Sequence, residues 1–261
     1  MLHHHLFSLT VVAVLALFSS AVPNQPTSVN LRIEGSTTTI FEGTVTTTGH
    51  NVTTALGGNN HCDGTNGGQN PLPGPTCTSA LDDASKASSF TFDGYDHFLY
   101  FTLPKMIANL LVGNRYSTFS TEFDDFFITS IGGDTQTAIQ FWGILVNFEF
   151  TPVGGCRQEV NANDDILFAF DAFNANAFLK LTGPATATPN RPAFFTVTDG
   201  QTGKPVAGAT LDVGPGASAA GTSDSNGQVS ATFMAVGSLH QVKASRPGSI
   251  RSDRVTVLVT F

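Results

Sequence analysis

The chain has 261 residues, of which 41% are hydrophobic and only 12% are charged, and its formal net charge at pH 7 is −8. This length accommodates one large or two ordinary domains. The negative net charge and the lack of any run of Lys and Arg in the sequence exclude the usual basic kind of nucleic-acid-binding protein.

The N-terminus begins with MLHHHLFSLTVVAVLALFSSAVP, in which an apolar run over 6–18 precedes Ser19, Ser20 and Ala21. The run is too short to span a bilayer comfortably, and the small residues suit cleavage after Ala21. Residues 1–21 are therefore predicted to be a secretory signal peptide, with a truncated expression tag as the alternative. We expect a secreted, extracellular protein, free or associated with the cell wall, with no stable membrane span after cleavage.

Two strands are predicted after this segment. The stretch SVNLRIEG places Val29, Leu31 and Ile33 on one face, and TTIFEGTVTTTG has the composition of a second strand that could pair with the first as a hairpin. The tripeptide that follows, from Asn51 to Thr53, is a glycosylation sequon, so Asn51 is a candidate N-glycosylation site.

Residues 61–77, HCDGTNGGQNPLPGPTC, form a loop rich in Gly, Asn and Pro that invites a metal-site interpretation. Zinc sites use nitrogen and sulfur ligands in CxxC or HxxxH spacing, which is missing from the set His50, His61, Cys62, Asp63 and Cys77. Asp63, Asn66 and Asn70 offer oxygen ligands for calcium, but their spacing is not that of an EF-hand. We therefore expect no metal here.

Three cysteines in an oxidising compartment leave one thiol unpaired. A Cys62–Cys77 bond would close only the loop, whereas Cys62–Cys156 would tie it to a distant part of the chain. Loop-closure entropy modestly favours the longer closure if the geometry permits it. We predict Cys62–Cys156, and Cys62–Cys77 remains the alternative.

The rest of the first half predicts one helix and several strands. Residues 76–86 read as a short helix, with Ser79 and Asp82 as its capping box. A strand is predicted in FDDFFITSIGG, and FWGILVNFEF over 141–150 predicts a half-buried central strand. The stretch DDILFAFDAF predicts another strand, with Ile166, Phe168 and Phe170 in register. One helix on a sheet is an α+β domain.

The amino-acid composition of the chain changes at Thr182. The remaining residues alternate strand-like runs with turn dipeptides such as Asp199-Gly200 and Asn226-Gly227 and show no helical period. Residues 183–261 are therefore predicted to be a small Ig-like β-sandwich. The predicted fold class is mainly β: an α+β domain over 22–182, followed by this sandwich.

Several stretches resemble known families. TSALDDA, FFITSIGG, QFWGILVNFEFTPVGGC and ANDDILFAF resemble the secreted domains related to the C-terminal domain of transcobalamin and intrinsic factor. That resemblance implies a β-grasp-like fold, with one helix on a mixed sheet, and capture of a small molecule. TGKPVAGATL and TSDSNGQVSATF are similar to bacterial Ig-like and carboxypeptidase-regulatory-like modules.

The segment over 95–115, YDHFLYFTLPKMIANLLVGNR, fits neither of its neighbours. Deleting it joins FTFDG smoothly to YSTFSTEFDDFF, and its ends can be encoded with a splice donor and an acceptor. We therefore interpret it as a retained intron or insertion. A genuine hydrophobic helix or lid is the alternative, and sequencing of the transcript distinguishes the two.

Signals for catalysis are weak. The adjacent acid pairs do not specify two carboxyls facing one substrate, and the sequence contains no G-x-S-x-G motif. We therefore expect a non-catalytic binding or adhesion protein without a cofactor, whose partner is a small molecule or a cell-wall glycan. The alternatives are a hydrolase that uses Asp63 or Asp171 and a purely structural surface protein. The candidate ligand-binding residues are His61, Asp63, Asn66, Trp142, Asn147, Phe173 and Asn174.

Overall fold

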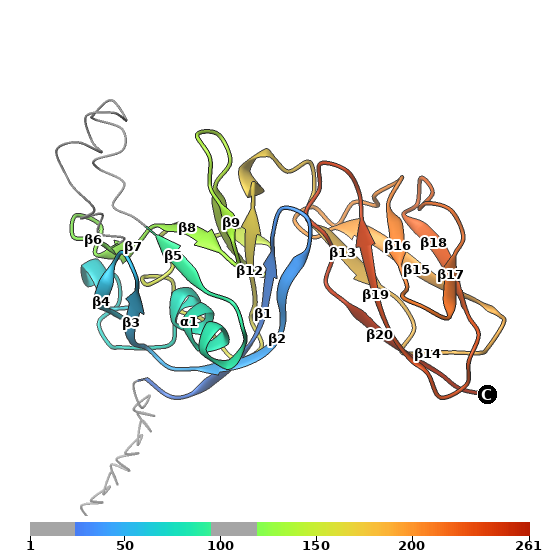
Figure 1. The fold of residues 1–261 in the computed structure, drawn as a ribbon, viewed down its shortest axis with the longest axis horizontal. Coiled ribbons are helices and arrows are strands. Elements are labelled where there is room, and N and C mark those ends of the chain that lie inside the picture. Colours follow the sequence, from blue (N-terminus) through green and yellow to red (C-terminus); the bar gives the residue numbers. More distant parts are fainter. Residues whose placement is uncertain (1–23, 95–118) are drawn as a thin grey trace, which may run out of the picture.

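The computed structural model describes residues 24–94 and 119–261 (Figure 1). The predicted signal peptide and the predicted insertion at 95–115 lie outside the described residues. Figure 1 shows two β-rich domains next to each other, the first coloured blue to yellow and the second orange to red. Within the described ranges, no helix is both long enough and apolar enough to cross a membrane.

The first domain combines one α-helix with short and long strands. Its helical elements are η1 (Asn66–Gly68), α1 (Cys77–Ala87) and η2 (Ala172–Asn174). Its strands are β1 (Thr27–Glu34), β2 (Thr39–Thr47), β3 (His50–Thr54), β4 (Gly58–Cys62), β5 (Phe92–Gly94), β6 (Phe119–Ser120), β7 (Asp125–Phe126), β8 (Ile128–Ile131), β9 (Asp134–Thr135), β10 (Trp142–Val146), β11 (Glu149–Phe150) and β12 (Asp165–Phe170).

The main sheet of this domain is mixed and has the order β11-β10-β12-β1-β2. Strand β1 pairs in parallel with β12 and antiparallel with β2, so the predicted hairpin of the first two strands is confirmed. Strand β12 is central and buried on both faces. Ile166, Phe168 and Phe170 point into the core beside α1, as predicted, and Leu167 and Ala169 point to the opposite side.

Helix α1 packs against β1, β2 and β3 and buries Ala80, Leu81 and Ala84. The predicted capping box was displaced by one turn. Thr76 is the N-cap, its side chain accepts from Ser79 N, and the Ser79 hydroxyl accepts from Thr76 N. The helix begins at Cys77, so Ser79 is its third residue, and Asp82 is left free to make other contacts.

The prediction of one continuous strand over 141–150 was wrong. Strand β10 ends at Val146, which pairs with Glu149 across a two-residue turn in which Asn147 and Phe148 have φ of 51° and 66°. Such primed turns need positive φ at both central residues, which is usual for Asn and rare for Phe. The turn moves Phe148 to the face opposite Trp142.

The second domain is a sandwich of two four-stranded sheets, β13-β15-β18-β17 and β14-β20-β19-β16. Phe195, Val197, Phe233 and Val242 lie in its buried core. This agrees with the predicted Ig-like β-sandwich. Its strands are β13 (Leu179–Thr182), β14 (Thr186–Ala187), β15 (Pro192–Asp199), β16 (Thr210–Asp212), β17 (Ala217–Ala219), β18 (Gln228–Phe233), β19 (Leu239–Ser245) and β20 (Val255–Val259). Because β13 pairs with β15, the sandwich begins a few residues before the composition change at Thr182.

The sandwich covers the face of the first sheet that α1 leaves open. Phe178 and Ile250 pack with Leu145 and Leu167 in a cluster that both domains share. The fit is close, since a Cβ added at Gly200 would lie 2.1 Å from the ring of Phe148. The two domains therefore meet through a packed apolar contact rather than a loose linker.

Candidate functional site

The loop over 61–77 is pinned by the predicted disulfide. Cys62, at the end of β4, bonds to Cys156 with an S–S distance of 1.94 Å and a Cα–Cα distance of 4.5 Å. This pairing confirms the prediction over the Cys62–Cys77 alternative. Cys77 is a buried free thiol in the first turn of α1, and burial raises its pKa.

The polar side chains of this loop mainly hold the loop itself. Asn66 is fully buried, and its Nδ2 donates to the carbonyl oxygens of His61 and Asp124, both at 2.8 Å. Asp63 Oδ1 accepts from the backbone and hydroxyl of Thr65. His61 Nε2 lies 3.2 Å from Asp124 Oδ2, and its side chain is 45% exposed. Of the three predicted residues, His61 is thus the one that presents its side chain to solvent.

Asp125 lies beside the disulfide and is 5% exposed. Its Oδ1 accepts from the backbone N–H groups of Phe126 and Cys156, while Oδ2 accepts from no described residue. Burial, opposed only in part by these bonds, raises the pKa of Asp125 to about 7. The sequence marked this aspartate only as one of an adjacent pair.

The other predicted residues lie in two further places. Trp142 is in the core, where its Nε1 donates to Asp134 O and its ring meets Phe170 edge to face. Asn147 holds the hairpin turn, because its Nδ2 donates to Asp164 Oδ1 and its Oδ1 accepts from Asp165 N.

Phe173 and Asn174 lie in η2, at the end of β12. The Phe173 ring is 64% exposed and stacks on Phe150 with a centroid distance of 5.1 Å. Asn174 Nδ2 donates to Asp171 Oδ1 and Ile139 O. The contacts thus divide the seven predicted residues among the pinned loop, the core with its hairpin turn, and this exposed aromatic pair.

A hollow lies elsewhere, where the two domains meet. It has a volume of about 580 Å³ and receives side chains from both sides. The first domain contributes Asn30, Thr44 and Asp165 together with the Phe148 ring, and the sandwich contributes Gln241, Asp253, Arg254 and Thr256. We call this hollow the interdomain cleft.

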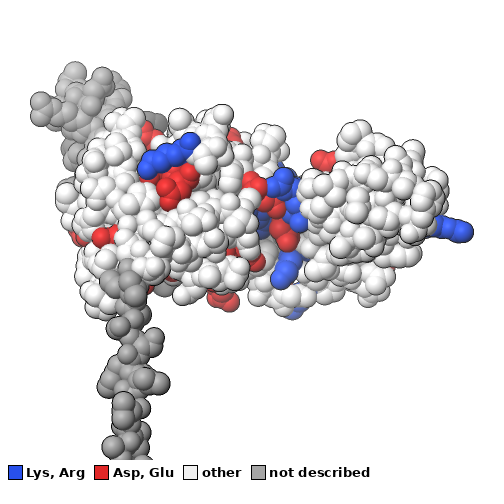
Figure 2. Space-filling view, turned by 90° about the horizontal axis from the view of Figure 1, so that it is seen from below, with Lys and Arg blue, Asp and Glu red and all other residues white. Residues whose placement is uncertain are grey.

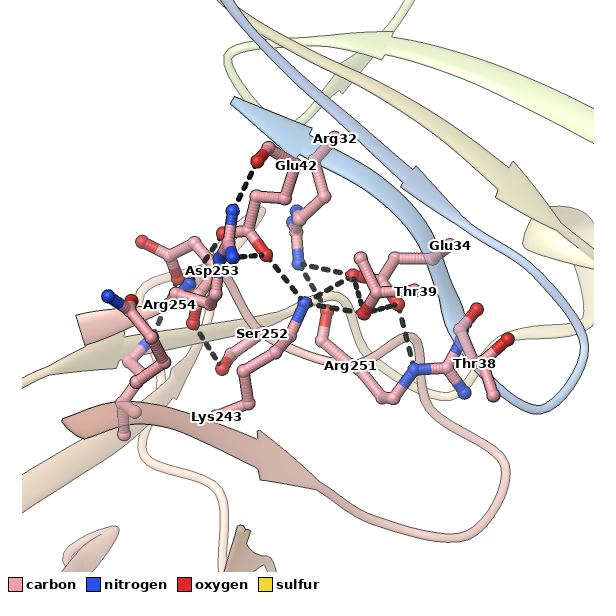
Figure 3. Close-up of polar contacts among 12 residues, drawn as sticks. Arg32, Glu34, Thr38, Thr39, Glu42, Lys243, Arg251, Ser252, Asp253 and Arg254 are labelled. Carbon is pink, nitrogen blue, oxygen red and sulfur yellow. Dashed lines mark hydrogen bonds and ion pairs between the residues drawn. The ribbon is translucent and has the colours of Figure 1, made fainter. Parts of the chain in front are cut away.

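A network of ion pairs borders the cleft and joins the domains (Figure 3). Glu34, only 1% exposed, accepts from Lys243 Nζ at 2.7 Å and from Arg251 Nε at 2.8 Å. Lys243 also donates to Glu42 Oε2 at 2.8 Å. Lys243 and Arg251 of the sandwich thus both bond to carboxylates of β1 and β2.

Further bonds complete this network. Arg254 donates to the carboxylate and the backbone carbonyl of Glu42, and Arg32 donates to the carbonyl oxygen of Arg251. Arg251 Nη2 donates to the carbonyls of Gly35 and Thr38. Figure 2 shows red and blue side chains gathered at this junction, and a second such group on the first domain. The network and the apolar cluster together fix the relative orientation of the domains, so the cleft is preformed.

Comparison with known families gives a match to part of the chain. Residues 106–172 match a transcobalamin-like family described as a "Domain of unknown function (DUF4430)". No curated protein matches the chain. The family match covers β6 to β12, including the Cys156 turn and the central strand, and part of it lies outside the described residues. It therefore supports the transcobalamin-like resemblance for this segment and gives no activity.

Proposed function

We propose that this protein is a secreted, non-catalytic binding protein whose ligand occupies the interdomain cleft. The observation that carries the proposal is a preformed hollow of about 580 Å³ between two firmly joined domains. Ligand sites commonly have volumes of roughly 300–1,000 Å³ and occur preferentially at domain interfaces. The cleft also lies on a sheet whose segment 106–172 is transcobalamin-like.

The chemistry of the cleft favours a neutral, hydroxyl-rich ligand such as a cell-wall glycan. Asn30 and Gln241 carry amides, Thr44 and Thr256 carry hydroxyls, and all four residues are exposed. Amides and hydroxyls both donate and accept hydrogen bonds, as sugar hydroxyls require. Phe148 adds an apolar surface, while Arg254 is already bonded to Glu42.

The carboxylates of the cleft also favour binding over hydrolysis. Glycoside hydrolysis needs one carboxyl as acid and another as nucleophile or base. Glu42 accepts from Lys243 and Arg254, Asp165 Oδ1 accepts from Asn30, and Asp253 Oδ1 accepts from Leu181 N. These bonds give each group a structural task.

One observation favours a hydrolase as the second candidate. Asp253 lines the cleft, and burial raises its pKa, as is typical of a general acid. The two candidates are distinguished by incubating purified mature protein with cell-wall glycans. The binding proposal predicts retained, uncut glycan for both wild type and Asp253→Asn. Cleavage products that disappear in Asp253→Asn would support the hydrolase instead.

The binding proposal is tested first on a glycan array and by a cell-wall pull-down of the mature protein. We expect retention on at least one class of neutral glycan and in the wall fraction. A protein that binds no glycan and stays out of the wall fraction would contradict the proposal and favour a purely structural role.

A further inference from the structure

Away from the cleft, one histidine and two aspartates bring three potential ligand atoms within 4.8 Å of one another. His50 begins β3, and Asp82 and Asp83 are consecutive residues of α1. His50 Nε2 lies 2.8 Å from Asp82 Oδ2 and 3.9 Å from Asp83 Oδ1. The packing of α1 on β3 therefore creates a cluster that the sequence spacing conceals.

The hydrogen bond made by Nδ1 of His50 determines whether Nε2 carries a hydrogen or a lone pair in the neutral ring. Nδ1 lies 2.8 Å from the carbonyl oxygen of Thr48. A carbonyl can only accept, so Nδ1 carries a hydrogen, and in the neutral ring Nε2 directs a lone pair at the two carboxylates. Three electron-pair donors then lie within 4.8 Å of one another, and a positive charge close to them offsets their repulsion.

A proton on Nε2 can form a hydrogen bond to only one of the two carboxylates. It can bond to Asp82 at 2.8 Å, but the 3.9 Å separation from Asp83 is too long for a hydrogen bond. Two ligands of a single ion with bonds of about 2.0–2.2 Å are separated by at most about 4.4 Å. Both distances from His50 Nε2 satisfy this limit, and the three ligand atoms all lie within 4.8 Å of one another.

Lys86 supplies a charge at the edge of the cluster. Its Nζ lies 2.5 Å from Asp82 Oδ2, but its side chain is 61% exposed, whereas that of Asp82 is 4% exposed. Lys86 reaches the oxygen from solvent, so a metal ion that binds Asp82 Oδ2 has to displace this ammonium group.

We propose that His50, Asp82 and Asp83 form a site for one divalent transition-metal ion of the Zn²⁺ class. One imidazole nitrogen and two carboxylate oxygens suit such an ion, whereas Ca²⁺ takes six to eight oxygen ligands. A bond from Nδ1–H to a backbone carbonyl is also the usual outer contact of a metal-binding histidine. The side chains of His50 and Asp83 are 23% and 30% exposed, which leaves an open side for water or a further ligand.

The test is a calorimetric titration of chelator-treated mature protein with Zn²⁺ at pH 7, in two buffers of different ionisation enthalpy. We expect one ion per chain, a raised thermal midpoint and proton release from the His50 imidazolium, because the metal replaces its proton. His50→Gln and Asp83→Asn should each weaken binding by at least about tenfold. Asp83→Asn leaves the contacts of Asp82 in place, so its fold can be verified by near-UV circular dichroism.

The matched control is His61→Gln. His61 belongs to another His–Asp pair, with Asp124 at 3.2 Å, and this change should leave Zn²⁺ affinity unaltered. Absence of binding in the wild type would overturn the proposal and leave His50 as a protonated structural contact. Equal affinity in wild type and Asp83→Asn would overturn it too, as would an equal loss in His61→Gln.

Discussion

At the scale of a single residue, the ionisation of Asp125 beside the disulfide makes the stability of the folded protein depend on pH. Its pKa is about 7 when the chain is folded, well above the ordinary value of 3.8. The folded chain therefore binds this proton more tightly than the unfolded chain. The resulting stability is complete below about pH 4 and is lost as pH rises through about 7.

The first prediction concerns Asp125→Asn, which keeps an oxygen for the N–H groups of Phe126 and Cys156 but cannot ionise. We expect wild-type stability to fall by about 3 kcal/mol between pH 5 and pH 8, whereas the stability of the variant changes much less over this range. Urea unfolding at both pH values measures this. Parallel losses of stability in the two proteins would contradict it.

The titration of His50 should also make the folded protein less stable as pH rises. Its hydrogen bond to Asp82 raises its pKa, so the stability it contributes is present below its ordinary value of 6.5 and is lost as pH rises through the raised value. Titration of the His50 ring in metal-free protein, followed by NMR, should show this raised pKa. A pKa at or below 6.5 would contradict the assignment of a proton to both ring nitrogens.

The chemical roles of single residues were only partly predictable. The amides and carboxylates of the pinned loop have the right types for a ligand site, yet Asn66 and Asp63 use them to hold the loop. Sequence shows which atoms a side chain offers but not which partner takes them. The position of His50 beside Asp82 depended on how a strand and a helix 32 residues apart pack.

At the scale of elements, the disulfide joins the end of β4 to the turn after β11, across a separation of 94 residues. Removing both cysteines as Cys62→Ser and Cys156→Ser should destabilise the protein by about 4 kcal/mol, because the unfolded chain regains the entropy of a long open loop. Thermal unfolding with and without a reductant checks this. Reductant should lower the midpoint of wild type and of Cys77→Ala, but not that of the double variant.

Elements with a continuous pattern were predicted well. The alternating apolar residues of β1 and β12 lie in the core, as their period predicts. The opposite face of both strands is buried as well, at Arg32, Glu34, Leu167 and Ala169, and the period does not predict this. The β10–β11 hairpin was missed because its alternation runs straight through the turn. The positive φ of Asn147 and Phe148 separates the two strands. For Phe148 this conformation is rare, and its ring packs against the sandwich at Gly200.

At the scale of the whole molecule, the interdomain network joins residues more than 200 positions apart, such as Glu34 and Arg251. No local pattern could predict these pairs or the cleft, which exists only once two domains are docked. The sequence did predict the mainly β fold class, with an α+β part and a β-sandwich. It did not show that the sandwich would cover one face of the first sheet.

The ion pairs between the domains should stabilise the docked arrangement of the two domains. Glu34→Gln leaves Lys243 and Arg251 facing a neutral side chain at a site that is 1% exposed. Breaking a buried pair in this way costs about 3 kcal/mol. We expect that loss in urea unfolding, together with a less compact shape in solution scattering. The exposed Glu149→Gln is the matched control and should change neither quantity.

The most direct test of cleft binding is the affinity of two tryptophan variants for a glycan that the wild type retains. Thr256→Trp places a large ring in the cleft, whereas Leu258→Trp changes a residue two positions along the same strand, outside the cleft lining. Measured by calorimetry, we expect Thr256→Trp to weaken binding by at least about tenfold, or about 1.4 kcal/mol, and Leu258→Trp to bind like wild type. Equal affinity in all three proteins would contradict the account, because the ligand would then lie somewhere other than the interdomain cleft.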